Sequence, residues 1–332
     1  MTNKLMKIVK SQKFLNVFCY VFCGIYLFFA ISVSCINASV IDARENDFNN
    51  LVSYVNSVNK RVEEENLIRK NQSQNSNNDG TSDSPIFSDG KTALLTAYEK
   101  FYNSKSFIAK VEGTIKTNII GIDIKISLAI TSIKYNENKY YDEFLIRYLD
   151  ASSMQATIEK AIQYGKQTYK VNDIILKRDC LKVSCENGVL SGYDYKAVTT
   201  IKEAYPICEN LLIINENTIQ EITYFKIQEK NGKPQYYYVQ AVLNPETATV
   251  NFKKASAFST EKCDFGIPSY TKNTITACID AKGNLIGLTC VDSATAPATG
   301  PGVGTITAAC DYTYTYAISG MNEEITYVPE GF

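Results

Sequence analysis

The sequence of 332 residues contains no histidine and no tryptophan. Histidine is the usual general base in enzymes and a common zinc ligand, so its absence excludes Ser-His-Asp and Cys-His catalytic groups and HExxH zinc sites. No two cysteines have the CxxC spacing, which argues against thioredoxin-type redox chemistry and zinc ribbons. We therefore expect no catalytic site, metal site or cofactor, and we expect that the protein is not an enzyme.

The chain also lacks an excess of charge of either sign. Lys and Arg number 34, Asp and Glu number 35, and the net charge is -1. A nucleic-acid-binding protein needs a basic surplus to neutralise phosphates. Nucleic acid is therefore not expected among the partners.

One long apolar run is present near the N-terminus, from Val17 to Ile36. Twenty helical residues span about 30 Å, which is the thickness of a bilayer core, whereas the apolar core of a cleaved signal has roughly 7 to 15 residues. Length thus favours a retained transmembrane anchor at 14–36. A lipoprotein signal ending at Cys35, which would then be lipidated, and a cleaved signal remain as alternatives, because Ser32 and Ser34 suit a peptidase.

The charges on the two sides of this run predict its orientation. Four lysines lie in residues 1–13, whereas acidic residues begin at Asp42. Positively charged residues that flank a transmembrane segment stay on the cytoplasmic side of the membrane. We therefore expect 1–13 to be a cytoplasmic tail and all residues after 36 to be extracytoplasmic. The protein would then cross the cell membrane once.

Residues 37–87 are expected to form a stalk and a tether. Phe48, Leu51, Val55, Val58 and Val62 follow the 3-4 spacing of a coiled-coil seam, which suggests a homodimer through 41–62 or, alternatively, a single amphipathic helix. Residues 71–85 are rich in Asn and Ser and have no apolar residue to bury before their closing proline, so we predict a flexible tether there.

From 88 to 332 the pattern predicts one helix followed by many strands. Asp89 or Ser88 can cap a helix, and alternating residues predict strands at 107–119, 122–131, 140–148, 219–227, 235–243, 273–279, 285–291 and 305–319. Turn signals occur at Gly165-Lys166, Asn187-Gly188 and Asn231-Gly232. We predict a second helix at 197–209 and a loop at 293–304, where the sequence is SATAPATGPGVG.

These elements predict an α+β fold in which a transmembrane helix precedes a large curved antiparallel sheet, an incomplete barrel, with two or three helices. Seven cysteines follow the apolar run. An oxidising exterior permits disulfides, and buried free thiols are the alternative. The candidates for disulfides are Cys180, Cys185, Cys278, Cys290 and Cys310, of which Cys180 and Cys185 would close a small loop.

The helix ahead of SFIAKVEGTI, the segment QYGKQTY, the hairpin strand KNGKPQYYYVQAVLNPET and the late strand DAKGNLIGLTC resemble the LolA-like family of envelope lipoproteins and lipoprotein carriers over 88–332. The resemblance implies an open barrel with an apolar cavity for acyl chains. We expect Phe107, Val111, Ile115, Ile124, Ile126 and Leu128 to line that cavity.

The function expected from the resemblance is a membrane-tethered binding protein of the bacterial cell envelope that holds a lipid, or the acyl chain of a lipoprotein, as a carrier or sensor. The alternative is a structural or protein-interaction domain without a small ligand. No residue of the family can be transferred position by position, because the resemblance lies in strand order and turns.

Overall fold

The structure is a computed structural model of the whole chain. It describes residues 49–57, 85–119, 122–150, 163–202, 212–246, 264–265, 267–300, 304–329 and 331–332.

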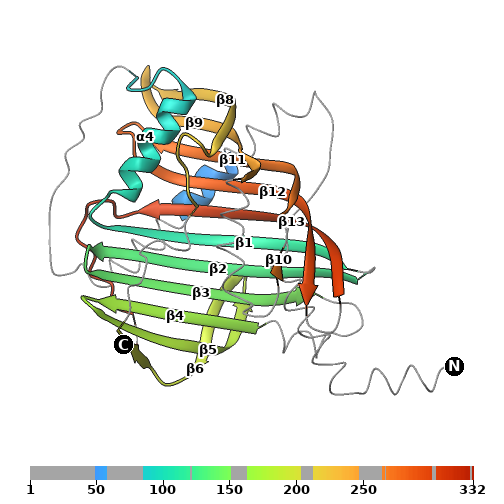
Figure 1. Cartoon of the computed structure of the whole chain (residues 1–332). Helices are drawn as coiled ribbons and strands as arrows, with labels where there is room; N and C mark the ends of the chain where they lie inside the picture. The colour runs from blue at the N-terminus through green and yellow to red at the C-terminus, as the bar shows by residue number, and fades with distance from the viewer. Residues whose placement is uncertain are drawn as a thin grey trace, which may run out of the picture.

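A single antiparallel sheet of 13 strands makes up most of the described chain (Figure 1). The strand order is β6-β5-β4-β3-β2-β1-β13-β12-β11-β9-β8, with β10 paired to β12 and β7 to β5. The strands are β1 (Phe107–Ile119), β2 (Ile122–Asn136), β3 (Lys139–Asp150), β4 (Gln163–Val171), β5 (Ile174–Glu186), β6 (Val189–Tyr195), β7 (Thr199–Ile201), β8 (Ile219–Lys230), β9 (Lys233–Leu243), β10 (Asp264–Phe265), β11 (Ser269–Asp280), β12 (Leu285–Gly300) and β13 (Gly304–Ser319).

Short turns with positive φ join neighbouring strands. Asn187 and Gly188 (φ 52° and 82°) close the β5–β6 hairpin, and Asn231 and Gly232 (φ 55° and 74°) close the β8–β9 hairpin. Both pairs have the left-handed conformation of a type I′ turn, whose twist matches that of the strands. These two predicted turns are confirmed.

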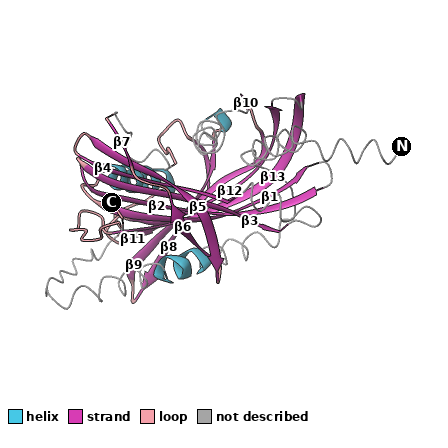
Figure 2. Ribbon diagram, turned by 90° about the horizontal axis from the view of Figure 1, so that it is seen from below, coloured by secondary structure: helices cyan, strands magenta, loops and turns pink. Residues whose placement is uncertain are grey.

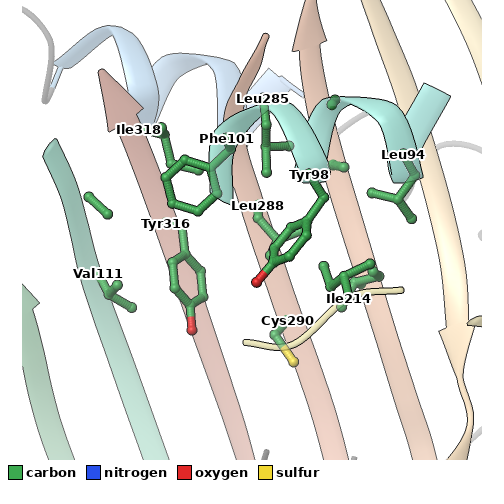
Figure 3. Packing of buried hydrophobic residues seen from close by; sticks show 14 of the residues in the cluster. Leu94, Tyr98, Phe101, Val111, Ile214, Leu285, Leu288, Cys290, Tyr316 and Ile318 are labelled. Atoms are coloured by element: carbon green, nitrogen blue, oxygen red, sulfur yellow. The ribbon is translucent and has the colours of Figure 1, made fainter. Parts of the chain in front are cut away.

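Helix α4 (Gly90–Tyr102) covers one face of the sheet. The Asp89 carboxylate accepts a hydrogen bond from the Thr92 amide and caps the helix, as predicted. Leu94, Tyr98 and Phe101 point from the helix toward the strands, where they pack with residues such as Leu288 in one large apolar cluster (Figure 3). This face is therefore filled by side chains.

The opposite face carries a second helix, at 49–57, and the C-terminal tail (Figure 2). Leu51 and Val55 of this helix are 2% and 1% exposed, and both contact the sheet at Gly287, where there is no side chain to hold them off. Tyr327 and Phe332 of the tail pack against Tyr141 of β3.

The predicted fold class is wrong. The described residues form one open sheet with only two helices longer than a turn, rather than an α+β arrangement after a transmembrane helix. Within these residues no helix is long and apolar enough to cross a membrane, and the predicted span at 14–36 lies outside them. The first part of the predicted helix at 197–209 forms β7 instead, and the rest of that prediction, from 203 on, lies outside the described residues. Most of the predicted loop at 293–304 belongs to β12.

Candidate functional site

A pocket of about 580 Å³ lies on the face of the sheet that carries helix 49–57. The central strands form its floor, and half of the floor residues bear a hydroxyl group. The floor residues are Glu112, Gly113, Thr114, Ser127, Leu128, Ala129, Gln240, Lys272, Thr274, Thr276, Thr289, Val291, Thr313 and Thr315.

The floor is organised in two rows that run across the strands. The first row places five residues opposite one another in register, namely Glu112, Thr315, Thr289, Thr276 and Gln240. The second row, two residues further along each strand, contains Thr114, Thr313, Val291 and Thr274. Strands lie about 4.8 Å apart, and two residues along a strand are about 6.7 Å apart, so the hydroxyls form a regular grid.

Two segments outside the central strands form the walls of the pocket. Asn50, Leu51 and Tyr54 of helix 49–57 form one wall. Gly188 and Leu190 of the β5–β6 hairpin form another, because this hairpin folds toward β2 and Leu190 clusters with Leu145 and Cys180. The pocket thus has a polar floor and partly apolar walls.

Hydrogen bonds within the first row orient its polar groups. The hydroxyl oxygens of Thr289 and Thr315 lie 3.4 Å apart, and the Gln240 side-chain amide donates to the Thr276 hydroxyl at 3.3 Å. The Thr223 hydroxyl donates to the Gln240 amide oxygen at 3.2 Å, which fixes which end of the amide faces Thr276. Each hydroxyl has one O–H donor and two lone pairs, so these bonds leave hydrogen-bonding capacity toward the pocket.

Four of the six residues predicted to line an apolar cavity instead pack in a filled apolar cluster. Phe107, Val111, Ile126 and Leu128 are buried in the cluster beneath α4, where side chains fill the space. Of these four only Leu128 also borders the pocket. Ile115 and Ile124 lie on β1 and β2, but their side chains are outside the described part of the structure. Alternation correctly identified a buried face, but α4 covers it.

The predicted small disulfide loop does not form. Cys180 and Cys185 lie on the same extended strand, β5, where five residues span about 16 Å, well beyond the reach of a disulfide. Both are free thiols in the structure, as are Cys278 and Cys290.

The cysteines of the late strands are also far apart. Cys278 is buried on the helix 49–57 face and Cys290 on the α4 face. Cys310 pairs in register with Ala294, four residues from Cys290 on β12 and hence about 13 Å away along the strand.

Burial changes the acidity of two of these thiols. It raises the pKa of Cys278 to about 12, with a smaller contribution from Asp280, and it raises the pKa of Cys290 well above its ordinary value, with Asp292 contributing in the same direction. These thiols are therefore protonated and behave as apolar core residues.

The remaining predicted features of the N-terminal region are only partly described. Cys35, the candidate for lipidation, and the tether at 71–85 lie outside the described residues. Of the predicted dimer seam at 41–62, Leu51 and Val55 are buried against the chain's own sheet, so these two positions are not available to a second copy.

A second polar cluster, beside the C-terminal tail, was not predicted from the sequence. Gln167 of β4 donates from its amide nitrogen to the Glu143 carboxylate and accepts a hydrogen bond from Arg178 at 2.6 Å. The Arg178 guanidinium lies 4.7 Å from the Phe332 ring centroid and 4.1 Å from that of Tyr195. Burial raises the pKa of Glu143, and hydrogen bonds from Gln167 and Tyr141 and the charge of Arg178 oppose this shift in part.

No cluster of three or more His, Cys, Asp or Glu side chains suited to a metal ion occurs in the described ranges. Among the described residues, the pocket is one arrangement that can hold a ligand. Ligand pockets generally enclose roughly 300 to 1,000 Å³ and combine apolar walls with a few placed polar groups. The volume and lining of this pocket fit that description.

No protein-family model and no curated protein sequence matches the chain. Among solved structures, an outer membrane lipoprotein-sorting protein domain from Vibrio parahaemolyticus is similar, with 12% identity, a TM-score of 0.22 and coverage of 73% of this chain and 94% of that one. The LolA superfamily protein NE2245 from Nitrosomonas europaea has 7% identity, a TM-score of 0.21 and coverage of 74% and 96%. A DUF1329 family protein from Desulfovibrio piger has 8% identity, a TM-score of 0.20 and coverage of 72% and 95%. Structures of the LolA superfamily, which the strand order of the sequence resembles, are thus among the similar ones.

Proposed function

We propose that this chain is a membrane-attached binding protein of the cell envelope that takes an amphiphilic ligand into the pocket between the sheet and helix 49–57. The observation that carries the proposal is the pocket itself, with a grid of hydroxyls as its floor and leucine side chains at its edges. The acyl chain expected from the family resemblance fits the apolar parts of the lining, Leu51, Leu190 and Val291, and the polar part of the ligand lies on the floor.

Binding rather than catalysis is favoured by how the floor is built. Its polar groups come from paired strands whose register holds them in place before any ligand arrives, so little ordering is needed on binding. The chain has no histidine to transfer protons at neutral pH. The protein then acts as a carrier or a sensor of its ligand.

Attachment to the membrane is supported by the N-terminal sequence. The apolar run from Val17 to Ile36 follows four lysines, and acidic residues come after it. This order supports a binding domain on the outer side of the cell membrane. Residues 14–36 or an acylated Cys35 would hold it there.

The test is mass spectrometry of the full-length chain, extracted gently from its native membrane, under native and then denaturing conditions. We expect an adduct of lipid size that is lost on denaturation. The denatured mass also shows whether residues 1–34 are retained and whether Cys35 carries an acyl group.

A matched pair of variants tests whether the adduct occupies the pocket. Thr313 is exposed and borders the pocket, whereas Thr295 is exposed on a neighbouring strand and does not border it. Thr313→Trp should remove the adduct and Thr295→Trp should keep it. An adduct that survives in both variants, or no adduct in the parent chain, contradicts the proposal and favours a protein-interaction domain.

A further inference from the structure

We propose that the polar part of the ligand is an uncharged, polyhydroxylated group, that is, a saccharide, which hydrogen-bonds to the threonine grid of the pocket floor. This inference rests on the proposed function, because it takes the pocket to be a ligand site. It adds to the proposed function the chemical class of the polar group that the floor recognises.

The polar groups of the floor match a saccharide in their type of hydrogen bonding. Thr289 and Thr315, at the centre of the first row, present hydroxyls that both donate and accept hydrogen bonds. A saccharide hydroxyl also donates and accepts, so each contact can form in either direction. Gln240, whose amide is held by Thr223 and Thr276, adds a group with both functions at the end of the same row.

The charge of the pocket lining also bears on the class of ligand. The lining contains one acidic residue, Glu112, and one basic residue, Lys272, so it has no net charge. Glu112 lies in register with Thr315 in the row that a ligand would occupy, and a phosphate or carboxylate there would face its carboxyl group. Like charges at such distances repel. The charge of Lys272 is already balanced within the lining by that of Glu112, so no surplus positive charge is left for an anion, and the floor favours a neutral polar group.

The spacing of the floor hydroxyls and an aromatic side chain on the wall also fit a saccharide. Hydroxyls recur about every 4.8 Å across the strands and about every 6.7 Å along them, which matches a ligand that carries several hydroxyls rather than one polar atom. Tyr54, on the wall formed by helix 49–57, adds an aromatic surface beside the floor. An aromatic ring with a polar tip can pack against the C–H face of a sugar while its hydroxyl stays in a polar environment.

The experiment uses the full-length chain in detergent micelles and native mass spectrometry with four probes. These are glucosyl-diacylglycerol, diacylglycerol, phosphatidylglycerol and the free saccharide maltotetraose. We expect glucosyl-diacylglycerol to bind at least about tenfold more tightly than diacylglycerol and phosphatidylglycerol, since several hydrogen bonds are gained without burial of a charge. Binding of maltotetraose in addition would identify a free glycan as the source, and its absence would identify a glycolipid.

A second pair of variants separates the hydroxyls from the shape of the pocket. The double variant Thr289→Val/Thr315→Val removes two central hydroxyls at nearly constant volume, and Thr295→Val removes one on the same face outside the pocket. We expect the double variant to weaken saccharide binding by about tenfold and Thr295→Val to leave it unchanged. Circular dichroism and the melting temperature of each variant establish that it is folded.

The outcomes distinguish this inference from the proposed function. Binding of phosphatidylglycerol or diacylglycerol that Thr313→Trp abolishes, without preference for the saccharide probes, overturns the saccharide inference and leaves the pocket as a ligand site. Equal binding by the parent and the Thr289→Val/Thr315→Val variant overturns it as well. No binding of any probe, together with no adduct from the native membrane, overturns both.

Discussion

Glu143 is an acidic residue held in a buried network between the sheet and the C-terminal tail. Gln167, its hydrogen-bond partner, is only 5% exposed, and burial raises the pKa of Glu143 above the usual value of 4.5. From about pH 4.5 up to the raised pKa, the folded chain holds a proton that the unfolded chain has lost. Unfolding then releases a proton, so the contribution of Glu143 to the free energy of unfolding falls as the pH rises through this window.

We therefore expect that Glu143→Gln gains stability relative to the parent chain as the pH is raised from about 4.5. Glutamine keeps an oxygen that can accept the bond from Gln167 but has no proton to lose. Urea unfolding at a series of pH values measures the difference, and Glu229→Gln, an exposed glutamate on β8, controls for the loss of one carboxylate. A stability difference that is the same at every pH would contradict the prediction.

The buried thiols allow a prediction about chemical modification. Cys290 is 1% exposed and Cys278 is fully buried, with a pKa of about 12, so at pH 8 only about one in ten thousand Cys278 thiols is ionised. Thiolates are the reactive form. Iodoacetamide should therefore modify the half-buried Cys185 in the folded chain and reach Cys278 and Cys290 only after denaturation.

Peptide mass spectrometry of native and denatured samples measures this. If Cys290 is modified as fast as Cys185, or if a disulfide joins two of the cysteine-containing peptides, the described strands do not bury these thiols as the structure shows.

Single residues also show how far the sequence is informative. The sequence correctly predicts a turn at Asn231 and Gly232, because no other common pair adopts two successive positive φ values as easily. The sequence also predicts a turn at Gly165, but this residue lies within β4, where an added Cβ would come within 2.7 Å of the Cys180 Cβ. A glycine needed for close packing and a glycine needed for a turn look the same in one sequence.

Among the elements, helix 49–57 depends on one position of the sheet. A Cβ added to Gly287 would lie 2.6 Å from a Val55 methyl group and 3.1 Å from a Leu51 methyl group. Gly287→Ala should therefore displace the helix and destabilise the chain by about 1 to 3 kcal/mol. Hydrogen exchange followed by mass spectrometry should show faster exchange in 49–57 while the amides of β12 and β13 stay protected.

The double variant Gly287→Ala/Val55→Ala supplies the control, since removal of two methyl groups makes room for the new one. It should restore part of the protection of 49–57. If Gly287→Ala leaves exchange in 49–57 unchanged, the helix does not depend on this contact.

Strands proved easier to predict than the segments between them. The alternation of apolar and polar residues correctly predicts β1 and β11, because the two faces of each strand lie in environments that differ from one another. The Pro, Gly and Ala content of the segment at 293–304 predicts a loop, yet Pro297 pairs in register with Thr307 of β13. Long-range pairing with β13 overrides the local preference there.

For the molecule as a whole, the sequence predicts which faces of the strands are buried but not which elements cover those faces. Val111 and Leu128 alternate as expected, but nothing in their spacing shows that α4 would fill the space above them. The floor of the pocket was missed for a related reason. Glu112 lies more than 150 residues from Thr276 and Thr315 in the chain, and only the strand order brings the three into one row.

The pairing of β1 with β13 at the middle of the sheet has a consequence for biosynthesis. The ribosome makes β1 first among the strands and β13 last, so one side of β1 has no neighbour until almost the entire polypeptide has been synthesised. During that time β1 presents an unpaired edge with apolar residues, which is the kind of edge that associates with other chains. If the chain is exported as it is made, a chaperone on the far side of the membrane would have to protect β1 until β13 arrives.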